Sequence, residues 1–263
     1  MASLSGALVQ GVVAQNGRFL TLEDVKRKVV LSDDVHACPT RVISLENTLG
    51  GSIMPLEETR RISEWARENG VMMHLDGARL WEAVAAGAGG LEEYTGLFDT
   101  VSLCFSKGLG APIGSVLVGS KEVVKRARWV RKSIGGGLRQ SGVVAAAARV
   151  GVEETFLGGE LKKGQAMARR IGEMWEERGG GLEREVETNM VWLDLEGQGV
   201  SEEEWVEAAG RRGVKVAGTR VVVHYQITEE AVGKLGEAMG EVLERKGGGG
   251  GGGGKKVGFK SYG

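Results

Sequence analysis

The sequence alternates short apolar runs with longer segments of helical periodicity, and this alternation limits the available folds more than any other feature. The short runs include TRVISLEN, VMMHLDG, DTVSLCFS and IGSVLVGS. Helical segments follow them: MPLEETRRISEWARENG, with Pro55 at its start and Gly70 at its end, then ARLWEAVAAGAGG and KEVVKRARWVRKSIGGG. Strand and helix alternation of this kind predicts a mainly parallel sheet covered by helices.

The alternation restarts on a smaller scale after a helical stretch expected over residues 140–170. Two further strands are predicted in EVETNMVWLDLEG and TRVVVHYQ, and Ser201 with Glu204 forms a capping box at the start of a helix between them. A last helix is predicted in TEEAVGKLGEAMGEVLERKG. We therefore expect a large domain over residues 1–164, a small α/β domain over 165–246, and a disordered Gly-rich tail over 247–263.

Composition excludes several classes of function. The 263 residues are 41% hydrophobic, which is enough for a substantial core, and 34 basic residues nearly balance 35 acidic ones. This balance favours neither nucleic acid nor an anionic membrane as a partner. Cys38 and Cys104 lie too far apart in the sequence for a CxxC zinc or redox motif. With no basic leader and no long apolar segment, the sequence predicts a cytoplasmic protein.

Lys107 lies in a glycine-rich turn, SLCFSKGLGAPIG, directly after an apolar run. The spacing of Gly108, Gly110 and Gly114 departs from the dinucleotide-binding GxGxxG motif, and no Ser or Thr follows the lysine as a phosphate-binding P-loop requires. The remaining chemical use of such a lysine is an imine with a carbonyl cofactor. The alternative is an ordinary loop lysine.

Asp76 ends the strand predicted in VMMHLDG, about one strand–helix–strand repeat before Lys107. Both residues are therefore expected at the carboxyl edge of neighbouring strands, where open α/β sheets bind ligands. Pyridoxal phosphate enzymes need this pair: a lysine that bonds to the cofactor and a carboxylate that keeps the pyridine nitrogen protonated. The alternative for Asp76 is a helix N-cap ahead of GARL.

Five segments follow one another along the chain: ISLENTLGG, MHLDGARLWEA, SLCFSKGLGAPIGSVLVG, RWVRKSIGGGLRQSG and ETNMVWLDL. Together they resemble the low-specificity L-threonine aldolases, which are pyridoxal phosphate lyases of fold type I. The resemblance extends to about Arg245. It implies a three-layer α/β/α large domain and a smaller C-terminal α/β domain. It also implies cleavage of L-threonine or L-allo-threonine, in amino acid metabolism, to glycine and an aldehyde.

The resemblance also implies roles for individual residues. Lys107 would hold pyridoxal phosphate covalently, Asp76 would pair with its pyridine nitrogen, and Arg79 would lie beside its ring and the substrate. Arg220 in TRVVVHYQ would clamp the substrate carboxylate, a task suited to a bidentate guanidinium. The alternatives for the two arginines are an ordinary surface residue and an ordinary strand residue.

Three more residues match the family less specifically. His36 corresponds to a catalytic histidine near the substrate hydroxyl, although a structural, hydrogen-bonded histidine is the alternative. Lys132 and Arg139 correspond to basic residues near the cofactor phosphate or the subunit interface. The resemblance further implies a small amino acid as substrate and a homodimer or homotetramer.

Family members extend further at the front, over the first strands of the large domain and the loop that cradles the cofactor phosphate. The chain also has Leu49 where the family usually has histidine. We therefore expect an N-terminally truncated large domain, weak cofactor binding and impaired cleavage. The alternatives are a β-eliminating pyridoxal phosphate lyase acting on another amino acid, and a catalytically inactive lyase-fold subunit with a structural or interaction role.

Overall fold

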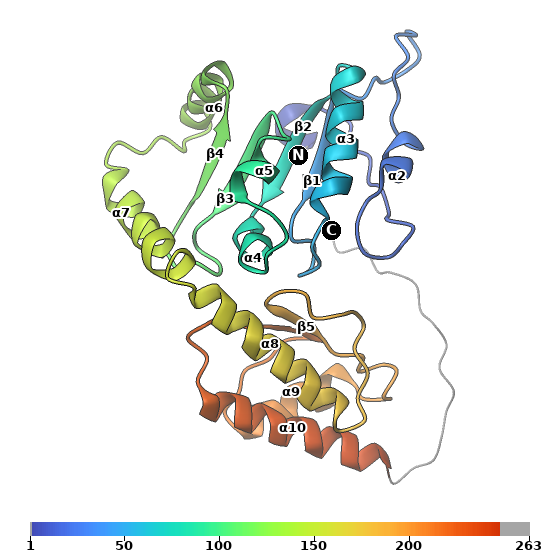
Figure 1. Cartoon of the computed structure of the whole chain (residues 1–263), viewed down its shortest axis with the longest axis vertical. Helices are drawn as coiled ribbons and strands as arrows, with labels where there is room; N and C mark the ends of the chain where they lie inside the picture. The colour runs from blue at the N-terminus through green and yellow to red at the C-terminus, as the bar shows by residue number, and fades with distance from the viewer. Residues whose placement is uncertain (1, 248–263) are drawn as a thin grey trace. The chain divides into compact units, whose positions relative to one another are not determined.

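A computed structural model describes residues 2–247 of the chain (Figure 1). These residues divide into two compact units, the first ending at Leu157 and the second beginning at Gly158. The boundary between the units precedes the one predicted at residues 164–165. The predicted disordered tail lies outside the described residues from position 248 onward.

A four-stranded sheet forms the centre of the first unit. Its strands are β1 (Val42–Glu46), β2 (Met72–Gly77), β3 (Thr100–Cys104) and β4 (Ser115–Gly119). They lie in the order β1-β2-β3-β4, with β1, β2 and β3 parallel and β4 antiparallel to β3 (Figure 1). The expected α/β architecture with a mainly parallel sheet is thereby confirmed.

The helices of the first unit connect and flank these strands. They are α1 (Ala2–Ser5), α2 (Leu22–Lys26), α3 (Leu56–Glu68), α4 (Leu80–Ala85), α5 (Leu91–Thr95), α6 (Lys121–Ser133) and α7 (Gly142–Val150), followed by a π-helical turn, η1 (Gly151–Phe156). Helix α3 begins and ends as predicted, with Pro55 as its N-cap. Gly70 follows its C-cap with φ +65°, a backbone conformation that suits glycine.

The two faces of the sheet differ in chemistry because side chains alternate along each strand. One face is buried and apolar, and α3 packs against β2. Its residues are Ile43, Leu45, Met73, Leu75, Val101 and Leu103. The opposite face is less buried and mostly polar: Ser44, Glu46, His74, Asp76, Thr100 and Ser102, with the exposed Val42 and Met72 where β1 and β2 begin. Functional groups at the end of this face are therefore open to a ligand.

The second unit has its own small sheet and its own core. Its elements are α8 (Glu160–Glu176), β5 (Met190–Trp192), α9 (Glu202–Arg211), β6 (Arg220–Val222) and α10 (Glu229–Gly247), with β5 and β6 antiparallel. The core includes Trp175 and Trp205, whose ring centroids lie 6.2 Å apart. The predicted capping box is present, since Ser201 accepts from the Glu204 amide and Glu204 accepts from the Ser201 amide.

The helical stretch expected over residues 140–170 is interrupted. Helix α7 and η1 end at Phe156, and α8 begins only at Glu160. The break has a local cause, because Gly159 precedes α8 with φ +80°, which a continuous right-handed helix does not allow. The sequence did not predict this interruption, because apolar residues continue at helical spacing on both sides of Gly158 and Gly159.

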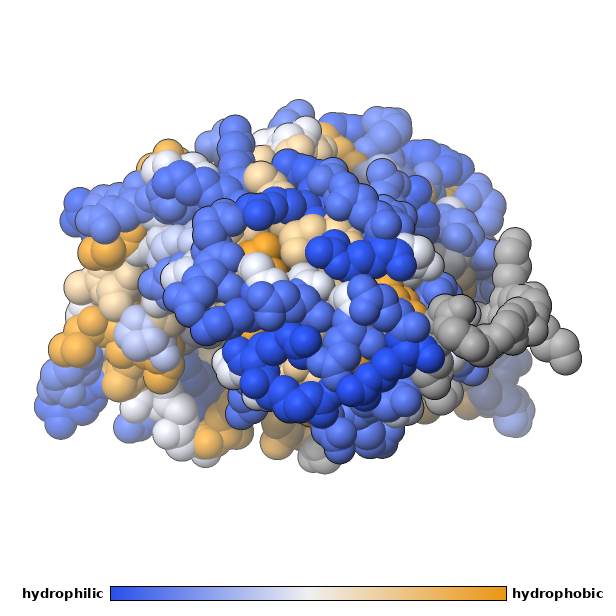
Figure 2. Space-filling model, turned by 90° about the horizontal axis from the view of Figure 1, so that it is seen from below, coloured by the Kyte–Doolittle hydropathy of each residue, from blue (hydrophilic) through white to orange (hydrophobic). Residues whose placement is uncertain are grey.

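Charged and polar side chains dominate the face of the protein drawn in Figure 2, with apolar patches between them. Apolar side chains scattered singly are usual on protein surfaces. Over residues 2–247, no helix combines the length and the apolar character needed to cross a membrane.

Candidate active site

Asp76 and Lys107 lie at the same edge of the sheet. Asp76 is the penultimate residue of β2 and pairs in register with Ser102 of the parallel strand β3. Lys107 lies in the turn that follows the end of β3 at Cys104. Because parallel strands place their carboxyl ends together, the fold brings these two residues to one region.

Backbone hydrogen bonds shape the turn that carries Lys107. The Gly110 amide donates to the Lys107 carbonyl at 2.9 Å, and the Phe105 amide donates to the Gly114 carbonyl at 3.0 Å. The Trp81 indole N–H donates to the Cys104 carbonyl at 3.1 Å, which anchors the end of β3 to α4. Across the described residues, no hydrogen bond or ion pair engages the Lys107 ammonium, so its nitrogen is available for chemistry.

Asp76 and Arg79 share the loop between β2 and α4. The Asp76 Oδ1 atom accepts a hydrogen bond from the Ala78 amide at 3.0 Å. Arg79 itself occupies the N-cap position of α4, and no side chain caps that helix. Asp76 therefore orders the turn, whereas the N-cap role considered for it belongs to Arg79.

Glu46 is a charged residue of this edge that the sequence analysis did not single out. It ends β1, pairs in register with Asp76 and shares its face of the sheet. Withdrawal from water and the like charge of Asp76 raise the pKa of the Glu46 carboxyl, while Lys107 and Arg79 act in the opposite direction. A signal was present in the sequence, because ISLEN and MHLDG both end an apolar run with an acid.

Three other candidates lie in the first unit: His36, Lys132 and Arg139. Among the described residues, none of the three has a recorded contact with Asp76, Arg79 or Lys107. His36 lies on a turn with its side chain 91% exposed and its Nδ1 atom 3.0 Å from Asp34 Oδ1. Lys132 lies in the last turn of α6, and Arg139 lies in the segment between α6 and α7; both are exposed. Their roles remain predictions.

Arg220, the residue expected to clamp a substrate carboxylate, begins β6 in the second unit. Its cross-strand partner on β5 is Trp192, and the guanidinium carbon lies 5.7 Å from the centroid of the Trp192 ring. The side chain of Arg220 is exposed. The guanidinium of Arg220 therefore lies over the Trp192 ring and is accessible to an anion.

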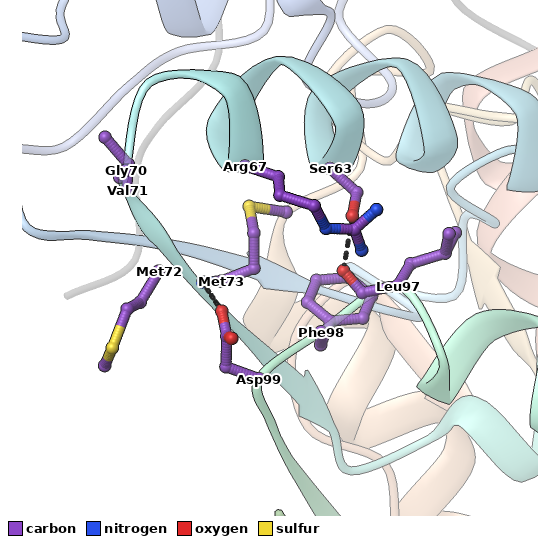
Figure 3. A pocket seen from close by; sticks show the side chains of 9 residues that line it. All are labelled: Ser63, Arg67, Gly70, Val71, Met72, Met73, Leu97, Phe98 and Asp99. Carbon is purple, nitrogen blue, oxygen red and sulfur yellow. Dashed lines mark hydrogen bonds between the residues drawn. The ribbon is translucent and has the colours of Figure 1, made fainter.

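A cavity of about 270 Å³ lies at the other end of the strands (Figure 3). It is lined by Ser63, Arg67, Gly70, Val71, Met72, Met73, Leu97, Phe98 and Asp99. The Met73 amide donates to Asp99 at 2.7 Å, and the Ser63 hydroxyl donates to the Leu97 carbonyl at 2.6 Å. Because these residues precede β2 and β3 or begin β2, the cavity does not belong to the edge that carries Asp76 and Lys107.

The residues at the carboxyl edge fit the predicted cofactor in chemical type. An unengaged lysine amine can bond to an aldehyde, and a carboxylate on the neighbouring strand can face a pyridine nitrogen. Glu46 and Arg79 add one negative and one positive charge to the same edge. The set is therefore suited to a ligand that carries both a protonated ring nitrogen and anionic groups.

Comparison with known proteins relates the chain to several enzymes. The aldolase vrtJ of Penicillium aethiopicum is 58% identical over 92% of this chain and 63% of its own length. The alanine racemase TOXG of Cochliobolus carbonum is 46% identical over 92% of this chain and 64% of its own length. The low specificity L-threonine aldolase of Saccharomyces cerevisiae is 43% identical over 93% of this chain and 63% of its own length.

A solved structure of Leishmania major threonine aldolase matches with a TM-score of 0.69 at 20% identity, over 88% of this chain and 68% of that chain. This match supports the fold-type-I architecture. The chain spans 63–64% of the length of the three curated relatives, so their whole-protein activities are not transferred by similarity alone. Residues 1–198 match the family model described as beta-eliminating lyase. The resemblance to the L-threonine aldolases is confirmed, and the chain belongs to the beta-eliminating lyase family.

Proposed function

We propose that this protein is a pyridoxal phosphate-dependent lyase that cleaves the Cα–Cβ bond of a β-hydroxy amino acid, giving glycine and an aldehyde. The observation that carries the proposal is the placement of Asp76 and an unengaged Lys107 at the carboxyl edge of neighbouring parallel strands. The family match supports it independently.

Each candidate residue has a distinct task in this proposal. The Lys107 Nζ atom bonds to the cofactor, and the Asp76 carboxylate holds a proton on its ring nitrogen. Arg220 binds the substrate carboxylate through two parallel N–H donors, which fixes the orientation of the bond to be broken. Pyridoxal phosphate, when bound, supplies the electron sink that stabilises the charge left on Cα. His36 is the proposed acceptor of the β-hydroxyl proton.

The relatives guide the choice of substrate. A low specificity L-threonine aldolase and an aldolase are among them, so L-threonine and L-allo-threonine are the proposed substrates. An alanine racemase is also among them, at 46% identity, which makes racemisation of alanine the second candidate. Racemisation removes and returns a proton at Cα and leaves the Cα–Cβ bond intact, so product analysis separates the two.

A cofactor titration with Lys107→Ala tests the proposal. The unmodified chain should acquire the visible absorption band of lysine-attached pyridoxal phosphate and release acetaldehyde from L-threonine, with the weak affinity and low rate expected from the sequence, and Lys107→Ala should do neither. Lys215→Ala, which removes an exposed lysine of the second unit, is the matched control and should retain both properties. The same samples should be assayed for D-alanine formed from L-alanine and for pyruvate formed by β-elimination from L-serine.

The outcomes separate the candidates. Acetaldehyde that depends on Lys107 supports aldol cleavage, whereas D-alanine or pyruvate as the Lys107-dependent product assigns the racemase or β-eliminating activity instead. If the unmodified chain shows neither the absorption band nor any of these products, the structural or interaction role is favoured.

A further inference from the structure

Trp192 makes contact with two guanidinium groups. The guanidinium carbon of Arg184 lies 4.6 Å from the Trp192 ring centroid, and that of Arg220 lies 5.7 Å from it. Both distances fall within the range in which a cation is attracted to the face of an indole. Trp192 is itself half-buried, which limits the motion of its ring.

Backbone hydrogen bonds to two neighbouring segments hold the main chain at Trp192 and Leu193 in place. The Glu183 amide donates to the Trp192 carbonyl at 2.9 Å, and the Leu193 amide donates to the Thr219 carbonyl at 3.0 Å. Trp192 and Arg220 are also directly paired in the β5–β6 register. Side chains at directly paired positions of antiparallel strands lie close together, so the ring is held beside the arginine by the sheet itself.

Among the described residues, the Trp192 ring is the group that contacts the Arg220 guanidinium. Within residues 2–247, no hydrogen bond or ion pair engages this group, and its N–H donors are free to receive a ligand. A long arginine side chain without a fixed partner samples many rotamers and must be ordered when a ligand binds. Contact with a ring that is already ordered reduces this cost while leaving the hydrogen-bonding edge of the guanidinium exposed.

We propose that Trp192 is a positioning residue for Arg220, holding its guanidinium in the orientation that receives the carboxylate of the amino acid substrate. The inference rests on the proposed function for the identity of the carboxylate. The Trp192–Arg220 contact itself does not depend on which reaction the protein catalyses.

The first measurement compares steady-state kinetics of the full chain with those of Trp192→Leu and Trp192→Phe, all with pyridoxal phosphate. Loss of the ring should raise KM for L-threonine about three- to tenfold with kcat nearly unchanged, because the carboxylate is bound before and during reaction alike. Trp192→Phe keeps an aromatic face and should recover most of the wild-type KM. Circular dichroism melts identify any variant that fails to fold.

The second measurement does not need turnover. Phenylglyoxal labels accessible arginines, and peptide mass spectrometry gives the rate of labelling at Arg220. Trp192→Leu should raise this rate severalfold and Trp192→Phe should raise it less. The matched control is Trp129→Leu, since Arg126 lies 4.2 Å from the exposed Trp129 ring. It should raise labelling at Arg126 and leave Arg220 unchanged.

The two readouts distinguish this inference from the proposed function. Absence of turnover in the unmodified chain would reject the proposed function, and the labelling rates would still decide whether Trp192 restrains Arg220. An Arg220 labelling rate and a KM that are both unaffected by Trp192→Leu would overturn the positioning role. A fall in kcat with unchanged KM would also overturn it, because it would place Trp192 in the chemical step.

Discussion

Glu46 and Asp76 place two carboxyl groups side by side at the edge of the sheet, in register on neighbouring strands. Withdrawal from water disfavours the ionised form of Glu46, and the like charge of Asp76 adds to this effect. The pKa of Glu46 is therefore raised. The folded protein binds a proton at Glu46 more readily than the unfolded chain does, which makes stability depend on pH.

Glu46→Gln should reveal this dependence. The favourable contribution of Glu46 is present below the ordinary glutamate pKa of about 4.3 and is lost as pH rises through the raised pKa of the folded state. The glutamine variant should therefore unfold with a larger free energy than the unmodified protein at pH 7, and the difference should shrink toward pH 4. Urea unfolding at both pH values measures it.

Glu241→Gln provides a control of opposite sign. Hydrogen bonds from Arg212 and Arg211 lower the pKa of the Glu241 carboxyl. Its favourable contribution is present above the ordinary pKa and is lost as pH falls through the lowered one. The variant should be less stable than the unmodified protein at pH 7 and approach it in acid. Identical pH profiles for the two variants would contradict both assignments.

The end of β2 depends on a glycine for its close contact with β3. A Cβ atom at Gly77 would lie 2.9 Å from the Ser102 carbonyl oxygen and 3.0 Å from a Leu103 methyl group. The first of these neighbours is backbone, so relief requires movement of a strand. Because Gly77 follows Asp76 directly, that movement would also displace the carboxylate of the candidate site.

Gly77→Ala should consequently destabilise the protein by about 1–3 kcal/mol and weaken cofactor binding. Gly210→Ala is the matched control, because Gly210 lies inside α9 and a Cβ there meets nothing within 4 Å. That change should stabilise the protein by about 0.5–1 kcal/mol. Chemical denaturation and pyridoxal phosphate titration of both variants check the pair; a neutral Gly77→Ala would contradict the strand contact.

The elements that the sequence predicted well are those with strong local signals. Pro55 and Gly70 bound α3, and Ser201 with Glu204 starts α9, because the capping chemistry is contained within a few residues. The edge position of Asp76 and Lys107 followed from the alternation of strands and helices. A lysine and a carboxylate at that edge already suggested pyridoxal phosphate, whereas the roles expected for Arg79, Arg220 and His36 came from the family resemblance.

Other features depended on contacts between distant residues, which no local pattern reports. The pairing of Glu46 with Asp76 requires the register of two strands, and the contact between Trp192 and Arg220 requires that of another two. The break before α8 was missed because apolar periodicity continues on both sides of Gly159. Short helices such as α2 and α5 also escaped prediction, since five residues carry little periodicity.

The protein as a whole contains two units with separate cores. Every member of the second core, including Leu193, follows Gly158 in the chain, whereas Leu75 is buried in the first unit. Separate cores allow separate unfolding, because each unit buries its apolar surface against itself.

Leu75→Ala and Leu193→Ala test this division with the same chemical change. Each should destabilise its own unit by about 2–5 kcal/mol, because both side chains are almost fully buried. Hydrogen exchange followed by mass spectrometry should show increased exchange in residues 1–157 for the first variant and in residues after 157 for the second. Equal increases across both units in either variant would indicate a single cooperative fold.

The position of β4 has a practical consequence for anyone who concentrates the purified protein. β4 is an edge strand of the sheet that residues 2–247 form, all five of its residues are exposed, and the strand carries no charged residue. Such an edge lacks the lysines and prolines that usually prevent strands of different molecules from pairing. Association should therefore grow with protein concentration, and colloidal stability will be governed by these five residues more than by the protein's small net charge.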